Sequence, residues 1–254
     1  MLIDSHAHIY SKDFDDDRAE VIARAQEDGV EKIYMPNIDH TSIDAMLEAE
    51  AAYAGHCIPM MGLHPTSVNK DFEKELYLVE EWLSKRAFAA VGECGIDLYW
   101  DKTFLLQQQE ALKVQLELSK KYKLPIVLHT RDSFDETYEL VSQAQDGSLR
   151  GIFHCFSGTP EQAAKVKELN FLMGIGGVAT FKNGGLDKVL PLVSLQDLVL
   201  ETDCPYLAPV PKRGKRNEPS YLVLVANRVA ELMQHPVEEV AAVTTQNALN
   251  LFKL

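Results

Sequence analysis

Eight short apolar runs, separated by segments of helical character, dominate this chain of 254 residues. Several runs are apolar without alternation, which is typical of strands buried on both faces of a parallel sheet. Eight strand–helix units in a chain of about 250 residues predict an α/β fold, a closed (β/α)8 TIM barrel, as a single domain over residues 1–254. The expected strands lie at residues 2–8, 31–37, 57–65, 87–95, 124–130, 151–158, 171–177 and 198–205.

Two of the intervening segments show helical periodicity most clearly. Residues 103–122 place leucines on one face, and residues 221–233 carry apolar side chains at positions i, i+3, i+4, i+7 and i+11. Pro219 suits the first turn of the second helix. An open, doubly wound sheet is the alternative architecture, but no G-x-G-x-x-G motif follows the first expected strand.

Composition limits the class of protein further. The four cysteines are scattered without a C-x-x-C pair, which predicts reduced thiols. No apolar run approaches the roughly 20 residues of a membrane helix, and no signal segment opens the chain. We therefore expect a cytoplasmic monomer without membrane contact. The net charge of −13 opposes passive coating of nucleic acid, although a basic patch or bound cations can invert the field at one site.

Polar residues gather where the expected strands end. In a (β/α)8 barrel the active site forms at these carboxyl ends. Alternation along a strand would put His6 and His8 on one face, with Asp4 on the same side. A buried cluster of imidazoles and carboxylates is costly unless divalent metal ions satisfy it. The residues at expected strand ends are His6, His8, His64, Glu93, His129, Arg131, His154, Glu201 and Asp203.

Each of these residues also has a simpler interpretation. A single strand histidine is more often a hydrogen-bonded core residue, but the recurrence of ligand types at the same end of several strands favours a metal site. The other histidines are expected at the surface: His40, His56 and His235. Because adjacent strand residues face opposite ways, three cysteines that follow candidate ligands are expected to be small buried residues: Cys94, Cys155 and Cys204.

The motifs DSHAH, GLHP, GECGID, LHTR, HCFSG and ETDCPYL occur in this order along the chain. This ordered set resembles the TatD family of metal-dependent hydrolases, deoxyribonuclease-like members of the amidohydrolase superfamily. The segments RGKRNEPS and TTQNALNLF also fit the family's C-terminal pattern. Any one motif is weak, but the set covers essentially the whole chain and is specific.

The resemblance implies a binuclear metal site. His6, His8 and Asp203 would hold one ion, His129 and His154 would hold the second, and Glu93 would bridge them. No lysine occupies residues 87–95, which favours the TatD-like branch over relatives that bridge their metals with a carboxylated lysine. The resemblance points to Mg²⁺ for nuclease activity, while imidazole and carboxylate donors leave Zn²⁺, Mn²⁺ and Ni²⁺ open.

The leading hypothesis is a metal-dependent deoxyribonuclease, a 3'-5' exonuclease that acts on single-stranded DNA ends. Two metals can activate a bridging water and neutralise charge on the phosphoryl group. Asp203, Glu93 and His64 would be catalytic, with Asp203 accepting the proton of the water. His64 and Arg131 would contact the substrate phosphate. Glu201 is expected to orient a histidine ligand.

The densest basic cluster lies after the last expected strand and includes Arg213, Lys215 and Arg216. We expect this loop to hold a nucleic-acid backbone, although a merely solvated loop is the alternative. No aromatic-rich stretch predicts a platform for stacked bases. Two other functions stay open: an amidohydrolase for a small amide, ester or nucleobase, and a non-catalytic metal-binding scaffold. The second is disfavoured because the ligand types and the candidate proton acceptor are intact.

Overall fold

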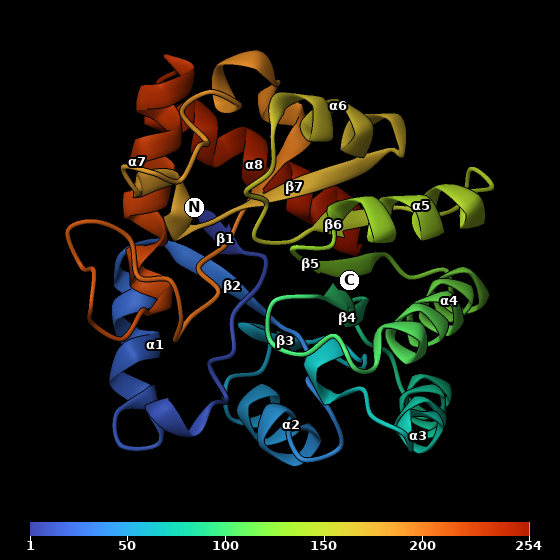
Figure 1. Ribbon diagram of the computed structural model, residues 1–254. Coiled ribbons are helices and arrows are strands. Elements are labelled where there is room, and N and C mark those ends of the chain that lie inside the picture. The colour runs from blue at the N-terminus through green and yellow to red at the C-terminus, as the bar shows by residue number, and fades with distance from the viewer. Residues whose placement is uncertain (254) are drawn as a thin grey trace.

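The computed structural model describes residues 1–253, and the expected barrel is present (Figure 1). Eight parallel strands follow one another around it in chain order. They are β1 (Leu2–Asp4), β2 (Val30–Met35), β3 (Cys57–Pro59), β4 (Val91–Asp97), β5 (Ile126–Arg131), β6 (Gly151–Phe153), β7 (Phe171–Ile175) and β8 (Leu198–Leu200).

Backbone hydrogen bonds close the barrel at two seams where the ladder is short. Between β3 and β4, the amide of Met61 donates to the carbonyl of Ala90 at 3.1 Å, and the amide of Gly92 donates to Met61 at 3.0 Å. Between β8 and β1, the amide of Ser5 donates to Leu200 at 3.0 Å. The sheet therefore has no free edge, and every strand end faces a common centre.

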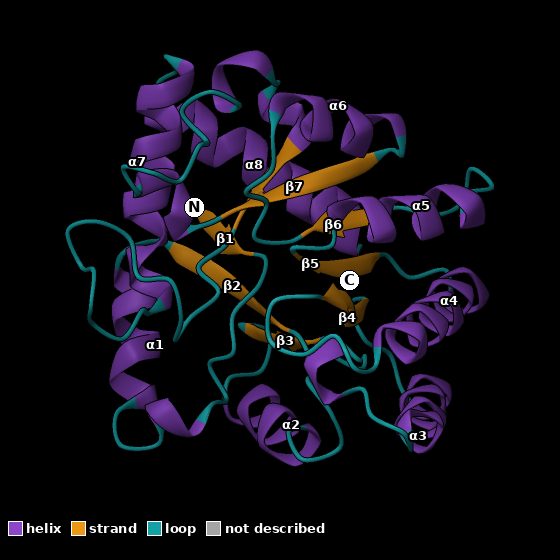
Figure 2. Cartoon of the chain, viewed as in Figure 1, coloured by secondary structure: helices purple, strands orange, loops and turns teal. Residues whose placement is uncertain are grey.

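Helices surround the barrel (Figure 2). Within the described residues, α1 to α6 each follow the strand of the same number, whereas α7 and α8 both come after β8. No helix of this part of the chain is both long and apolar enough to cross a bilayer. The helices are α1 (Arg18–Glu27), α2 (Ile43–Ala52), α3 (Phe72–Lys85), α4 (Leu105–Tyr122), α5 (Phe134–Ala144), α6 (Pro160–Glu168), α7 (Leu222–Met233) and α8 (Val237–Phe252).

The two helices expected from periodicity are confirmed. The first is α4. The second is α7, whose apolar stripe of Leu222, Val225 and Val229 is buried against the barrel. Pro219 starts a 3-10 turn, η6 (Pro219–Tyr221), directly before α7. A proline fits there because its missing N–H would have no helical partner in the first turn.

An apolar floor fills the amino-terminal end of the barrel. Its side chains come from all eight strands or the residue just before them, and the ring of Phe252, at the end of α8, packs in the same cluster. The ring of Phe252 stacks on Tyr34 with centroids 3.9 Å apart. The inward-facing residues of this floor are Ile3, Tyr34, Ile58, Ala90, Val127, Ile152, Leu172 and Val199.

Several strands end earlier than the sequence predicts. β1 ends at Asp4 and β8 at Leu200, so His6, His8 and Asp203 lie in the segments that follow the strands. The expected strand bounds were wrong here because the chain leaves the regular ladder where it enters the mouth of the barrel. Asp203 adopts a left-handed backbone conformation with φ 56°, which is uncommon for a residue other than glycine.

Candidate metal centre

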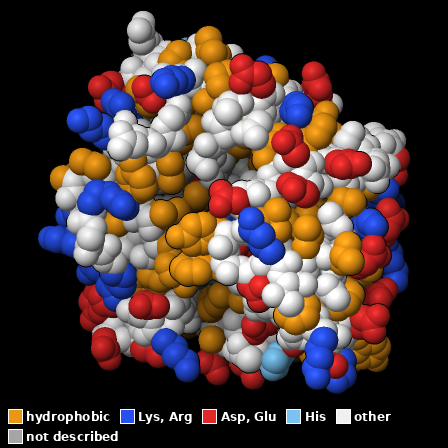
Figure 3. Space-filling model, in the orientation of Figure 1, with side chains coloured by type: hydrophobic (Ala, Val, Ile, Leu, Met, Phe, Trp, Pro, Cys, Tyr) orange, Lys and Arg blue, Asp and Glu red, His pale blue; other side chains and the backbone are white. Residues whose placement is uncertain are grey.

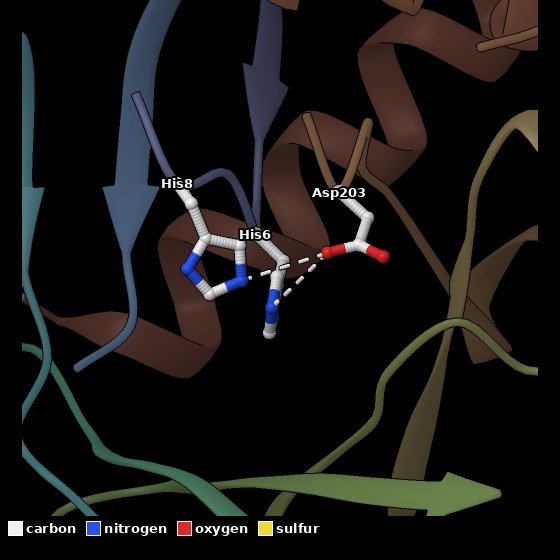
Figure 4. A group of neighbouring side chains, drawn as sticks. All are labelled: His6, His8 and Asp203. Atoms are coloured by element: carbon white, nitrogen blue, oxygen red, sulfur yellow. Dashed lines mark ion pairs between the residues drawn. The ribbon is translucent and has the colours of Figure 1, made fainter. Parts of the chain in front are cut away.

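The first donor group joins the segments after β1 and β8 (Figure 4). The Nε2 atoms of His6 and His8 lie 3.7 Å and 3.6 Å from Oδ1 of Asp203. The amide of Asp203 donates to the carbonyl of His6 at 2.9 Å and locks the two segments together. Separations of this size are too long for hydrogen bonds but suit atoms that share one cation at about 2.0–2.2 Å each.

The second donor group gathers around Glu93 on β4. Its Oε1 atom lies 2.8 Å from Nδ1 of His129, 3.0 Å from Nε2 of His154 and 3.3 Å from Nε2 of His64. Its Oε2 atom faces the first group, 3.0 Å from Nε2 of His6. One carboxylate therefore stands between the two groups and presents one oxygen to each.

Outer hydrogen bonds determine which nitrogen of two histidines is free. The hydroxyl of Tyr10 donates to the carbonyl of Pro36, so it accepts the Nδ1 proton of His8 at 2.9 Å. Nδ1 of His154 lies 3.1 Å from Oε1 of Glu201. An ionised carboxylate can only accept a hydrogen bond, so Nδ1 of His154 carries the proton between them. In its neutral form each ring therefore has an Nε2 lone pair that points into the centre.

Asp97 does the same for His129, but through the opposite nitrogen. Its Oδ2 atom accepts from Nε2 of His129 at 2.9 Å, which leaves Nδ1 facing Glu93. Burial opposes ionisation of Asp97, yet hydrogen bonds from His129 and from the backbone of Trp100 outweigh it and lower its pKa to about 2. Sequence reasoning gave Asp97 no role. Its position four residues after Glu93 on the same strand could have indicated it, because alternate residues share a face.

Glu201 contacts a histidine of the centre, as the sequence predicts. Besides His154, its Oε1 atom accepts the backbone amide of Cys155. Gly174 on β7 makes room for it, because a Cβ at that position would lie 2.2 Å from Oε2 of Glu201. The absence of a side chain at Gly174 therefore allows the Glu201 carboxylate to lie beneath His154.

His64 differs from the other histidines of the centre. Its Nδ1 atom accepts the backbone N–H of Thr66 at 3.1 Å, and a backbone amide can only donate. Burial lowers the pKa of His64, which favours the neutral ring. The neutral ring must then carry its proton on Nε2. His64 thus presents a hydrogen-bond donor toward Glu93, where the other rings present lone pairs.

The centre is electrostatically unbalanced without a cation. Both ring nitrogens of His6 are buried and lack a hydrogen-bond partner within residues 1–253. Burial raises the pKa of Asp203 to about 6, and burial together with the neighbouring His6 lowers the pKa of His8 to about 3. Burial would also raise the pKa of Glu93, but the surrounding imidazoles outweigh it and hold that pKa well below its usual range. Cations bound between these donors would satisfy them together.

Three of the predicted substrate-binding residues, Arg131, Arg213 and Lys215, have cationic groups without a carboxylate partner among the described residues. The guanidinium carbon of Arg131 lies 3.9 Å from the ring centroid of Tyr99. That of Arg213 lies 3.9 Å from the ring of Phe181, and its Nη1 atom donates to the carbonyl of Ala208. Lys215 is exposed on the same loop as Arg213.

Arg216 is engaged elsewhere. Its two terminal nitrogens donate to the two carboxylate oxygens of Asp17 at 2.8 Å and 2.6 Å, and its guanidinium packs over the ring of Phe14. This paired contact ties the loop after β8 to the segment that leads into α1. It argues against the expected contact between Arg216 and a nucleic-acid backbone, because the donors are already used.

Two expectations about single residues were wrong. Asp4 does not join His6 and His8. Its carboxylate accepts the amide and the hydroxyl of Thr202 at 2.9 Å and 2.5 Å, because β1 ends there and the alternation stops. His56 is buried rather than on the surface, with Nδ1 2.6 Å from the carbonyl of Glu31. His40 and His235 are exposed, as expected; of the three cysteines, Cys94 and Cys204 are buried and Cys155 is partly exposed.

A closed (β/α)8 barrel with this set of donors at the carboxyl ends of its strands fits a metal-dependent hydrolase. The sequence model of the family described as "TatD related DNase" matches residues 3–253, and the chain belongs to this family.

Three relatives agree with this assignment. The chain is 37% identical over 255 residues to the "Uncharacterized metal-dependent hydrolase YabD" of Bacillus subtilis, with 100% of both chains covered. It is 31% identical over 257 residues to the "3'-5' ssDNA/RNA exonuclease TatD" of Cronobacter turicensis, covering 99% of this chain and 97% of that one. The crystal structure of the TatD homologue YjjV from Escherichia coli K12 superposes with a TM-score of 0.93 at 30% identity, over 100% of this chain and 98% of that one.

Proposed function

We propose that this protein is a binuclear metal-dependent phosphodiesterase that degrades single-stranded DNA from its 3' end. The observation that carries the proposal is the placement of Glu93, whose two carboxylate oxygens face two separate donor groups. The relatives named as 3'-5' ssDNA/RNA exonucleases, at about 30% identity, supply the direction of cleavage and the class of substrate.

The donors present fit two divalent cations. His6, His8 and Asp203 would hold one ion and His129 and His154 the other, with Glu93 shared between them. The unpartnered nitrogens of His6 and the close grouping of His6, His8 and Asp203 support the first ion, and Glu93 lies in close groups with His154 and with His129. When bound, the cations would lower the pKa of water and polarise the phosphoryl oxygen. Mg²⁺ suits the carboxylates and Zn²⁺, Mn²⁺ or Ni²⁺ the imidazoles.

The side chains around this centre have distinct tasks in the proposed reaction. Asp203 directs Oδ1 toward His6 and His8, and we assign its other oxygen, Oδ2, as the acceptor of the water's proton. The Nε2–H group of His64 would donate to a phosphate oxygen. Arg131 can donate two parallel hydrogen bonds to the same phosphate.

The rival function is hydrolysis of a small neutral amide or ester. The free cations of Arg131, Arg213 and Lys215 favour the nucleic-acid substrate, since a small neutral molecule would leave them without a partner. Positive groups near a centre attract a polyanion even in a chain with a net charge of −13.

The test is cleavage of a 5'-labelled single-stranded DNA oligonucleotide after chelation and re-addition of Mg²⁺, Mn²⁺ or Zn²⁺. We expect a ladder that shortens from the 3' end, only with metal, and not when the 3' end is blocked. Glu93→Gln should lower the rate by about 10³-fold or more, which corresponds to about 4 kcal/mol. Glu110→Gln, an exposed glutamate on α4, is the matched control.

Two results would overturn the proposal. The first is metal-bound protein that leaves DNA and RNA oligonucleotides intact but hydrolyses small amides or esters. The second is cleavage that survives in Glu93→Gln, because the shared carboxylate would then be dispensable.

A further inference from the structure

Two large aromatic side chains stand exposed just beyond the candidate metal centre. Tyr99 and Trp100 directly follow β4 and are 54% and 68% exposed. Their ring centroids lie 4.9 Å apart with the planes at 88°, so the pair offers ring surface in two directions. Figure 3 shows a hollow near the centre of the viewed face, with hydrophobic, acidic and basic side chains around it. Adjacent aromatic surface of this kind marks a binding site more often than a single exposed apolar residue does.

The aromatic pair is anchored to the centre itself. The backbone amides of Tyr99 and Trp100 both donate to Oδ1 of Asp97, at 2.9 Å and 3.1 Å. The other oxygen of this carboxylate accepts from Nε2 of His129. The Asp97 carboxylate therefore fixes the turn that carries Tyr99 and Trp100 relative to His129, a candidate metal ligand.

Arg131 completes the arrangement. It pairs with Asp97 in the β4–β5 register, two residues beyond His129, so it lies one layer above the centre. Its guanidinium carbon is 3.9 Å from the ring centroid of Tyr99 and 5.3 Å from that of Trp100. It forms no ion pair within residues 1–253, so stacking positions the cation while its N–H donors stay free for an anion.

A cavity of about 330 Å³ opens beside Trp100. Trp100 lines it together with Phe104, Gln108 and Thr66 and with the carboxylates of Asp39, Glu75, Asp97 and Asp101. Thr66 and Asp97 are the residues that hydrogen-bond His64 and His129, so the cavity adjoins the centre directly. Its volume lies within the range of small-ligand sites, about 300–1,000 Å³, and it combines an aromatic wall with polar groups.

We propose that Tyr99 and Trp100 form a stacking subsite for a nucleobase of the single-stranded substrate, with Arg131 bound to the phosphate of that nucleotide. The inference rests on the proposed function and adds to it how the strand is held. A nucleotide joins a planar base to an anionic phosphate. The base fits the exposed rings of Tyr99 and Trp100, and the phosphate fits the unpaired guanidinium of Arg131. Because every base has a π-face, the subsite would accept all four bases, with each stacked base worth about 1–3 kcal/mol.

The first test compares an intact single-stranded DNA pentanucleotide with five variants of it. Each variant lacks the base at one of the five positions. At the position that the subsite serves, loss of the base should lower kcat/KM of the wild-type protein by about 5- to 150-fold. Trp100→Ala should lower kcat/KM for the intact strand by a similar factor and leave that abasic strand unchanged. Trp100→Phe should restore part of the loss, and Leu106→Ala, an exposed apolar residue on α4, is the matched control.

The second test measures binding without cleavage. The chain has two tryptophans, Trp82 and Trp100, so Trp82→Phe leaves Trp100 as the sole indole. Titration of the metal-loaded protein with a phosphorothioate pentanucleotide should quench its fluorescence, and the abasic version should not.

The outcomes separate the subsite from the activity. The subsite would be wrong if Trp100→Ala lowered kcat/KM equally for the intact and abasic strands, or for neither, and if quenching did not depend on the base. The proposed function would still stand, because both strands are cleaved. Base-dependent quenching without any cleavage would overturn the proposed function and keep the subsite. Neither cleavage nor quenching would overturn both.

Discussion

The two ends of this barrel are built from the same eight strands but differ in chemistry. The floor is apolar throughout, with the stacked rings of Tyr34 and Phe252 at its base. The mouth buries imidazoles and carboxylates, some of them without partners, around Glu93. Burial of apolar side chains stabilises the fold by about 1.5–3 kcal/mol for each large residue, whereas burial of unpaired polar groups destabilises it. The packed floor therefore supports a mouth that would not be stable in isolation.

The backbone at the mouth is irregular, because the chain leaves the strand ladder there. Asp203 and Cys155 adopt positive φ values of 56° and 47°, which residues other than glycine rarely accept. Such conformations persist where the surrounding structure over-determines them. These two residues therefore combine an uncommon backbone conformation with a place in or beside the candidate metal centre.

The largest effect should come from opening the floor. Phe252→Ala removes the ring that closes it and should lower the free energy of unfolding by about 3–5 kcal/mol. Denaturant titration measures this loss, and Leu249→Ala, a partly exposed residue on the same helix, should cost far less. The metal content of each folded molecule should not change. A smaller metal content would show that the two ends are coupled.

Removal of metal should have the next largest effect. At a free metal concentration 100 times the Kd, binding stabilises the folded state by about 2.7 kcal/mol, so chelation should lower Tm by about 5–10 °C. Such a shift would show that bound metal ions stabilise the mouth, whereas packing stabilises the floor. Scanning calorimetry with and without chelator measures the shift, which should persist in Phe252→Ala because distant sites are additive. An unchanged Tm after chelation and re-addition would contradict a metal centre at the mouth.

A smaller effect should follow from the support beneath His154. Glu201→Gln removes the charge that orients this ring and should weaken metal binding by about 10- to 100-fold in calorimetric titration. Gly174→Ala should displace the same carboxylate and have a similar effect, since a Cβ would lie 2.2 Å from it. The double variant should lose less than the sum of both. Full additivity would show that the two residues act separately.

The smallest effect concerns His56, a buried histidine that directly precedes β3 and lies outside the metal centre. Burial lowers the pKa of His56, so the unfolded chain binds a proton that the folded chain does not. This histidine therefore contributes stability that is fully present above its unfolded pKa of about 6.5 and is lost as pH falls below it. His56→Gln should flatten the decline in stability between about pH 7 and pH 5, relative to His235→Gln at the exposed start of α8. Parallel pH profiles for the two variants would contradict this prediction.

Local pattern in the sequence was enough for the architecture and for most of the centre. Apolar runs located all eight strands, and motifs at their ends supplied His129, His154 and Glu93 as candidates. Helical periodicity identified the buried face of α7 from Leu222 to Val229. These features can be read within short windows because periodicity and strand ends depend on near neighbours in the chain.

Tertiary structure alone decided which polar groups meet. Arg216 pairs with Asp17 across almost the whole length of the chain, and this contact uses donors that looked free for a substrate. Asp97 joins His129 to the turn that carries Trp100, and only the structure shows which groups its two oxygens contact. The physical reason is that a hydrogen bond or an ion pair depends on angstrom-scale distances between atoms. Those distances are fixed only once the barrel has closed and brought remote segments together.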